Sequence, residues 1–133
     1  MEIEFDFKEE ESGLFGRILR PVARIILVNG EIELPEHVYS DSGADVTLIS
    51  KSVGDILGFK IDDKDEVTEI KGVGERGVPI IVKKVKIKVG GKLFEARVAW
   101  ALVEEVPLLL GRTDVFNLFD ICFMKNEKTV FRD

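Results

Sequence analysis

Apolar and polar residues alternate along many short segments of the chain, and this period of two predicts half-buried β-strands. Asn29 and Gly30 separate two of these segments, and this dipeptide is typical of a tight β-hairpin turn. Gly90 and Gly91 separate two longer segments and predict a second turn. The strands expected from the pattern cover residues 2–7, 22–28, 31–34, 46–49, 67–70, 78–89, 92–103, 108–110, 121–124 and 129–131.

Two further segments fit short helices. Residues 52–58 follow the candidate N-caps Ser50 and Ser52 and end at Gly58, a residue type that favours a helix terminus. Residues 113–118 are the second candidate. Many short strands, close turns and one or two short helices predict a mostly-β domain, either a closed barrel or a sandwich. The length of 133 residues, without an internal repeat, predicts a single domain over residues 1–133.

The composition is that of an ordinary folded domain, with 45% hydrophobic and 33% charged residues. A net charge of −6 argues against a nucleic-acid binder, because neutralising phosphates needs a basic face. The single cysteine, Cys122, excludes an internal disulfide. With no apolar leader in Met1–Glu11 and no membrane-length apolar run, we expect a cytoplasmic protein that does not contact a membrane. The complete lack of Gln is a compositional hint of a thermophile.

Two motifs have a simple structural interpretation. Residues 72–77 match the G-x-G-x-x-G pattern of dinucleotide-binding loops, but that function needs a helix to follow, and here strand residues with Pro79 follow. We interpret the segment as a glycine-rich hairpin tip. The lysines of residues 83–88 alternate with apolar residues from Lys84 onward, which predicts the solvent-facing side of a strand.

Neither a metal nor a cofactor is expected. His37 is the only histidine, which excludes a site built from several histidines, and the chain has no zinc-ligand spacing. His37 fits a surface histidine better than the base of a serine nucleophile, because no partner is evident to orient its ring. Cys122 lies in an apolar run and predicts a buried, unreactive thiol.

The most unusual segment is Asp41-Ser42-Gly43-Ala44-Asp45, which lies directly before the apolar residues 46–49. One interpretation is an ordinary turn, because Asp and Ser side chains readily bond to nearby backbone. The longer string favours a site instead. Gly43 can offer an unhindered backbone N–H to a carboxylate, Ala44 keeps the floor of a groove small, and Asp45 brings a second carboxylate to the same region.

Residues 41–49 resemble the active-site signature of the retropepsin-like aspartic proteases. Leu108–Arg112 is similar to the motif of two apolar residues, Gly and Arg or Asp near the C-terminus of that family. The glycine-rich hairpin between the two motifs lies where the family carries its flap. The resemblance spans about residues 22–131 and implies a closed acid-protease β-barrel lobe. Residues 1–20 would be an N-terminal extension, and residues 119–133 a C-terminal hairpin.

The resemblance also implies a role for each matched residue. Asp41 would be the catalytic carboxylate, Ser42 would hydrogen-bond across a dimer interface, and the Gly43 backbone would help to hold the carboxylates. Asp45 would contact the substrate backbone and form a structural ion pair with Arg112. The flap tip at Gly72, Val73 and Gly74 would cover a bound peptide.

The chain contains one such aspartate motif, whereas aspartic proteolysis needs two carboxylates at one site. A working site therefore requires a C2 homodimer with one Asp41 from each subunit. The expected activity is that of an aspartic endopeptidase acting on peptides with apolar side chains near the cut.

The sequence also departs from the family, which usually has apolar residues where this chain has Tyr39 and Ser40. A non-catalytic retropepsin-fold module that dimerises or binds extended peptides is the main alternative. A β-barrel with a coincidental Asp-Ser-Gly sequence is the other.

Overall fold

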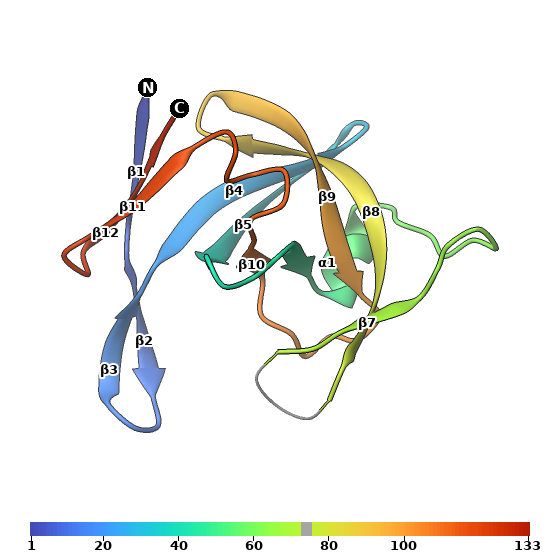
Figure 1. The fold of residues 1–133 in the computed structure, drawn as a ribbon, viewed down its shortest axis with the longest axis horizontal. Coiled ribbons are helices and arrows are strands. Elements are labelled where there is room, and N and C mark those ends of the chain that lie inside the picture. The colour runs from blue at the N-terminus through green and yellow to red at the C-terminus, as the bar shows by residue number, and fades with distance from the viewer. Residues whose placement is uncertain (73–75) are drawn as a thin grey trace.

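The computed structural model describes residues 1–72 and 76–133, and within these ranges the chain forms twelve strands and one short helix. Seven strands make the central sheet shown in Figure 1. Their order across the sheet is β4 (Val22–Asn29), β5 (Ile32–Ser40), β10 (Leu109–Leu110), β6 (Thr47–Ile49), β9 (Lys92–Ala101), β8 (Val78–Val89) and β7 (Thr68–Ile70).

The sheet closes into a six-stranded barrel because β8 pairs with two strands along one edge. Its C-terminal part pairs with β4, where Leu27 lies opposite Ile87, and its N-terminal part pairs with β7, where Thr68 lies opposite Ile80. Closure pairs the edge of β4 with β8 and, among the described residues, leaves the outer edge of β7 as the open edge of this sheet. The closed, mostly-β barrel expected from the sequence is therefore confirmed. The hairpin around Gly30, which adopts a φ of +60°, is confirmed as well.

The barrel interior is filled by alternate residues of the long strands. Val85 and Ile87 of β8 are buried, whereas Lys84 and Lys86 are exposed. This strand therefore has one buried face and one solvent-exposed face, as its sequence predicts. Trp100 of β9 is the largest fully buried side chain. None of the helical structure in the described ranges is long and apolar enough to span a membrane.

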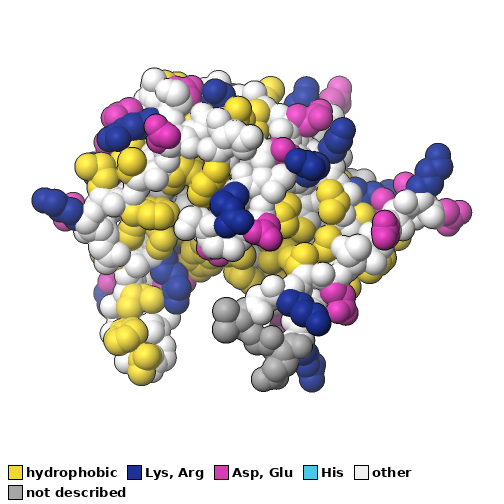
Figure 2. Space-filling view, viewed as in Figure 1, with side chains coloured by type: hydrophobic (Ala, Val, Ile, Leu, Met, Phe, Trp, Pro, Cys, Tyr) yellow, Lys and Arg dark blue, Asp and Glu magenta, His cyan; other side chains and the backbone are white. Residues whose placement is uncertain are grey.

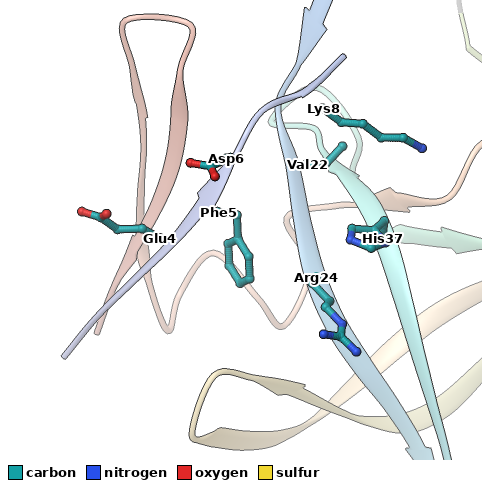
Figure 3. A pocket seen from close by; sticks show the side chains of 7 residues that line it. All are labelled: Glu4, Phe5, Asp6, Lys8, Val22, Arg24 and His37. Carbon is teal, nitrogen blue, oxygen red and sulfur yellow. The ribbon is translucent and has the colours of Figure 1, made fainter. Parts of the chain in front are cut away.

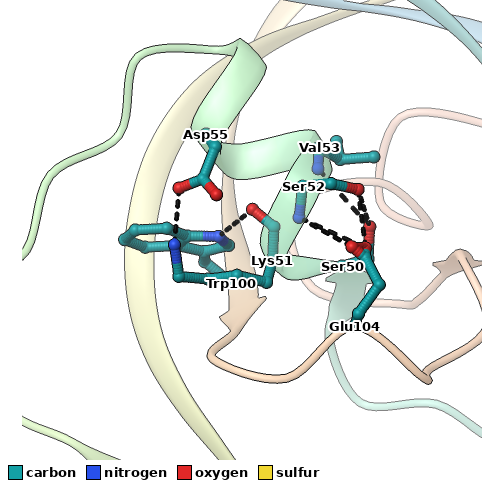
Figure 4. A network of polar contacts seen from close by, with 7 residues as sticks. All are labelled: Ser50, Lys51, Ser52, Val53, Asp55, Trp100 and Glu104. Atoms are coloured by element: carbon teal, nitrogen blue, oxygen red, sulfur yellow. Dashed lines mark hydrogen bonds and ion pairs between the residues drawn. The ribbon is translucent and has the colours of Figure 1, made fainter.

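The single helix, α1 (Lys51–Ile56), begins one residue before the predicted start. Ser50 is the N-cap, and its hydroxyl accepts a hydrogen bond from the backbone N–H of Val53 at 3.4 Å. Glu104 reaches the same end from a distant loop and accepts from the Ser52 hydroxyl at 2.6 Å and from the Ser52 N–H at 3.2 Å (Figure 4). The hydroxyl of Ser52 thus ties the helix to that loop, while Ser50 caps it.

Helix α1 packs closely on the indole of Trp100. The ring N–H donates to the carbonyl of Lys51 at 3.2 Å (Figure 4), and a Cβ added to Gly54 would lie only 2.0 Å from that ring nitrogen. Gly54 is therefore present because no larger residue fits between helix and strand.

The second predicted helix, over residues 113–118, is wrong, because this segment forms consecutive turns. Asp114 has a φ of +65°, which an α-helix does not allow. Its carboxylate accepts hydrogen bonds from the Arg97 side chain at 2.8 and 3.0 Å and from the Arg97 backbone N–H at 3.0 Å. These bonds lower the pKa of Asp114 to about 2. A tertiary contact to β9 therefore holds this segment in turns, and its residues have little helical preference to oppose it.

A second, three-stranded sheet joins the two ends of the chain. It has the order β1 (Glu2–Asp6), β12 (Lys128–Arg132) and β11 (Asp120–Met124), so the N-terminal strand pairs with the last strand. Phe131 of β12 packs edge-to-face on Phe5 and Phe119, with ring centroids 5.7 and 5.4 Å away. Cys122 of β11 is only half-buried, with the Arg132 guanidinium 3.6 Å from its sulfur. The expectation of a buried thiol is therefore wrong, since β11 is an outer strand of this sheet.

Strands β2 (Lys8–Ser12) and β3 (Gly16–Arg20) form a two-stranded hairpin that the sequence pattern does not predict. It extends away from the barrel, toward the lower left in the view of Figure 1. We call this hairpin, residues 8–20, the arm. Its tip carries exposed apolar side chains (Figure 2).

Candidate active site

Asp41 begins the loop that connects β5 to β6, and the short strand β10 holds both ends of that loop. Leu109 of β10 pairs in parallel with Tyr39 of β5 and antiparallel with Leu48 of β6. The backbone N–H of Asp41 donates to the carbonyl of Leu110 at 3.1 Å. The two sequence motifs, about 70 residues apart in the chain, therefore lie side by side in the fold.

The Asp41 carboxylate is held by its own loop. One carboxylate oxygen accepts a hydrogen bond from the backbone N–H of Gly43 at 2.9 Å, and the Ala44 N–H donates to the Asp41 carbonyl at 3.2 Å. A Cβ added to Gly43 would lie 3.2 Å from the bonded carboxylate oxygen, so glycine gives this turn room to close. Asp41 as a whole is half-buried. It is thus oriented by backbone while it stays accessible from one side.

Arg112 clamps the same loop from the second motif. Its guanidinium pairs with the carboxylate of Asp45 and donates to the carbonyl of Ser42 at 2.6 Å. Its backbone N–H also donates to the carbonyl of Ala44 at 2.9 Å. The structure therefore brings Asp45 and Arg112 together as the resemblance implies. The Asp45 side chain is 86% exposed, so the ion pair between Asp45 and Arg112 lies at the surface, where it adds little stability. The hydrogen bond from Arg112 to the Ser42 carbonyl is therefore the more important of the two contacts for holding the loop.

Gly111 allows the loop and the second motif to approach each other, a role that the sequence motif did not reveal. A Cβ at Gly111 would lie 2.3 Å from the carbonyl carbon of Val46, so only glycine fits at this crossing. The N–H of Gly111 donates to the hydroxyl of the fully buried Thr47 at 3.1 Å. Thr113 adds a further bond from its hydroxyl to the carbonyl of Asp45 at 2.6 Å.

The two residues before Asp41, which depart from the family pattern, have different surroundings. Ser40 is 5% exposed, and within the described part of the chain its hydroxyl has no hydrogen-bond partner. Tyr39 turns its hydroxyl toward the arm and donates to the carboxylate of Glu10 at 2.7 Å. This hydrogen bond raises the pKa of Tyr39.

A cavity of about 280 Å³ opens beside Asp41. One wall is the Asp41 loop. The other wall comes from Ile70 at the end of β7, from Lys71 and Gly72, and from Val78 at the start of β8. Its apolar lining and the single cation Lys71 suit an extended chain with apolar side chains. The lining residues are Asp41, Gly43, Ala44, Asp45, Val46, Leu48, Ile70, Lys71, Gly72, Val78 and Leu109.

The remaining candidate residues lie around this cavity or outside the described part of the chain. Gly72 lines the cavity, whereas Val73 and Gly74 fall outside the described residues. Ser42 is exposed at the tip of the loop and does not contribute to the lining.

His37 is exposed as expected and lines a different, larger cavity of about 550 Å³ between β1 and the barrel (Figure 3). That cavity contains no residue of the Asp41 loop. Among residues 1–72 and 76–133, no cluster of three His, Cys, Asp or Glu side chains could hold a metal ion.

Solved structures define the class of fold to which this arrangement belongs. The chain is similar to EIAV protease complexed with the inhibitor HBY-793, at 26% identity and a TM-score of 0.58, over 74% of this chain and 88% of that chain. It is also similar to a retropepsin-like aspartic protease from Rickettsia conorii, at 16% identity and a TM-score of 0.67, over 98% of this chain and 91% of that chain. No protein-family model and no curated protein sequence matches the chain. The chain has the retropepsin-like fold.

Proposed function

We propose that the chain is one protomer of a homodimeric aspartic endopeptidase, and that Asp41 is its catalytic residue. The observation that carries this proposal is the placement of Asp41. Its carboxylate is oriented by Gly43, its backbone is bound to Leu110, and it opens into a cavity with a largely apolar lining. The retropepsin-like fold and the similarity to two aspartic proteases support the same chemistry.

The chemistry requires a second carboxylate, which a twofold axis beside Asp41 would supply from the partner subunit's Asp41. Two carboxylates in contact cannot both ionise, so the pair shares one proton. The ionised member takes a proton from water, whose oxygen attacks the carbonyl carbon of the peptide, while the protonated member donates to the carbonyl oxygen. Collapse of the tetrahedral intermediate breaks the C–N bond and passes a proton to the leaving amine.

The remaining residues would position loop and substrate. The clamp by Arg112 would hold the loop at the axis, with Ser42 at its exposed tip facing the partner. The residues from Gly72 to Gly77 would act as a flap over the peptide. The apolar lining at Val46, Ile70 and Val78 would accept apolar side chains beside the cut.

The test is Asp41→Asn, which keeps the size of the side chain and replaces its ionisable carboxyl group with a neutral amide. We expect the purified wild-type dimer to cleave a library of peptides with apolar residues at some pH between about 3 and 8. The variant should lose this cleavage while sedimentation shows the same dimer. Cleavage that survives in the variant, or a wild-type dimer without activity over the whole range, would contradict the proposal.

The second candidate function is a non-catalytic module that binds extended peptides. It is favoured by β7, which ends the central sheet and, among the described residues, pairs with β8 alone, so its other edge can accept a peptide strand. The two functions differ in the separation of the two Asp41 carboxylates in the dimer. Hydrogen-bonding distance supports the enzyme, whereas separated carboxylates support the binding module.

A further inference from the structure

The cavity beside Asp41 is lined by three charged residues, of which one is a cation. Asp41 and Asp45 belong to the wall that the loop forms, whereas Lys71 belongs to the other wall, directly after β7. The other lining residues are apolar or glycine. Because Asp41 and Lys71 lie on different walls, a ligand carboxylate can meet Lys71 on the wall away from Asp41.

The charge of Asp45 is already matched within the protein. Its carboxylate pairs with the guanidinium of Arg112, a residue that does not line the cavity. Lys71, in contrast, is exposed, and among residues 1–72 and 76–133 no carboxylate forms an ion pair with its ammonium group. Lys71 is therefore the cation that the described cavity offers to a ligand.

The floor of the cavity is apolar and belongs to a small hydrophobic cluster outside the main core. Leu48 is buried in this cluster with Ile80, and the half-buried side chains of Val46, Ile70 and Val78 pack against it. A charged side chain placed on this floor would lose its hydration without gaining a partner. The cavity thus offers an apolar floor for one ligand side chain and an exposed ammonium group for another.

The open edge of β7 sets how far apart these two ligand side chains would be. Ile70 is the last residue of β7, and an extended peptide that pairs along this edge would place one of its side chains beside Ile70. Residues two apart in an extended chain point to the same side and lie about 7 Å apart. The flexible four-carbon stem of Lys71 lets its ammonium group cover a separation of one or two peptide residues.

We propose that Lys71 selects peptides that carry an acidic side chain, Asp or Glu, within two residues of the apolar side chain on the cavity floor. This specificity rests on the proposed function, because it names the substrates of the same site. The ion pair forms when the peptide binds and needs no catalysis. Since an ion pair between exposed groups is weak, Lys71 discriminates among peptides, while the apolar floor supplies most of the affinity.

The first experiment measures the affinity of labelled peptides for Asp41→Asn, the variant that should leave them uncut, by fluorescence anisotropy. Short peptides with acetylated and amidated ends carry two adjacent apolar residues, with Glu or Gln at each nearby position in turn. At low salt, the best Glu peptide should bind about two- to fivefold more tightly than its Gln counterpart. The difference should shrink in about 500 mM NaCl, because salt screens an exposed ion pair.

Substitutions of Lys71 in the same Asp41→Asn background assign the preference to this residue. Lys71→Met keeps the length of the side chain without its charge, so it should bind the Glu and Gln peptides with equal affinity. Lys71→Glu should bind the Gln peptide more tightly than the Glu peptide. The control is Lys64→Met, which changes the net charge by the same amount on an exposed turn outside the cavity lining, and it should keep the preference for Glu.

Three results would overturn the proposal. They are a preference for Glu that survives in Lys71→Met, equal binding of the Glu and Gln peptides to Asp41→Asn, and binding of no peptide in the set. A free C-terminus is a second source of a peptide carboxylate, so the Gln peptides are also measured without the C-terminal amide. A gain in affinity that depends on Lys71 only in these peptides would assign Lys71 to the C-terminus, and the proposal would be wrong.

Cleavage by the wild type separates this proposal from the proposed function. If the preference for Glu depends on Lys71 but the wild type cleaves none of the peptides, the recognition by Lys71 stands and the endopeptidase does not. If the wild type cleaves the Glu and Gln peptides with the same kcat/KM and they bind Asp41→Asn equally, the endopeptidase stands and Lys71 does not select its substrates.

Discussion

Gly111 lies so close to Val46 that any side chain at position 111 would occupy the space of the Val46 carbonyl. A Cβ there would be 2.3 Å from the carbonyl carbon and 2.4 Å from its oxygen. This contact joins the two sequence motifs through their backbones. The position of the Asp41 loop therefore depends on Gly111, a residue without a side chain that could bind or react.

The first prediction is that Gly111→Ala displaces the loop. We expect it to lower the free energy of unfolding by about 2–4 kcal/mol, because the clash is with backbone that cannot rotate away. Urea unfolding measures the change. Gly91→Ala is the control, since a Cβ there would have only the Met1 sulfur within 4.0 Å, and it should change stability by less than about 0.5 kcal/mol. Equal effects of the two substitutions would refute the steric interpretation.

The second prediction concerns two buried threonines that differ in hydrogen bonding. Thr47 accepts the N–H of Gly111, whereas the hydroxyl of Thr129 has no partner within residues 1–72 and 76–133, and both residues are fully buried. Thr47→Val should lower the free energy of unfolding by about 1–3 kcal/mol, because it leaves a buried N–H unpaired.

Thr129→Val is the matched control and should be neutral or stabilising, because it removes a buried hydroxyl that makes no bond. Both variants keep the shape of the side chain, so denaturant unfolding isolates the effect of the hydrogen bond. A larger loss of stability at Thr129 than at Thr47 would show that the hydroxyls are bonded differently.

Local turn chemistry and the alternating pattern predicted most of the barrel strands, although β5 continues to Ser40, six residues beyond its predicted end at Leu34. Asn29 and Gly30 specify their hairpin within a few residues, and the hydrophobic alternation of β8 fixes which side faces the core. The pair of motifs likewise indicated that Asp41 and Arg112 belong to one site. These features depend on residues that are near in sequence or on a resemblance that spans both motifs.

The features that the sequence did not reveal depend on contacts between distant segments. Residues 113–118 were predicted as a short helix although Leu118 is their one strong helix former, and the bonds from Arg97 hold Asp114 in a left-handed conformation. The arm was missed because Lys8–Ser12 is almost entirely charged and shows no alternation. The close approach of Gly111 to Val46 could not be predicted, since it needs the crossing of two strands to be known.

The third prediction separates the two bonds of Arg112. Asp45→Asn should change the free energy of unfolding by less than about 1 kcal/mol, because the ion pair that it weakens is exposed. Arg112→Lys keeps the charge but loses the planar fork that reaches both Asp45 and the Ser42 carbonyl. Under the proposed endopeptidase function, we expect it to reduce peptide cleavage by about tenfold or more through a misplaced Asp41 loop.

Kinetics and unfolding measured on the same preparations distinguish these effects. A value of kcat that falls in Arg112→Lys while the folded fraction stays the same indicates a positioning role. If Arg112→Lys cleaves peptides as the wild type does, the charge alone is sufficient and the bond to Ser42 has no part in positioning.

The last prediction is a pH dependence at Asp114. Hydrogen bonds from Arg97 lower the pKa of its carboxyl from 3.8 to about 2, so the ionised form favours the folded state. Its stabilising contribution is therefore present above about pH 4 and is lost as the pH falls toward 2. Asp114→Asn tolerates the φ of +65°, but it removes the charge and replaces one of the two oxygens that accept from Arg97 with an NH2 donor, so it should be less stable than the wild type at neutral pH. The gap in melting temperature between the wild type and Asp114→Asn should close as the pH approaches 2.

Asp63→Asn, on an exposed turn without a hydrogen bond or ion pair among the described residues, is the control. A gap that stays constant from neutral pH to pH 2 would mean that the Arg97 contact does not depend on the Asp114 charge.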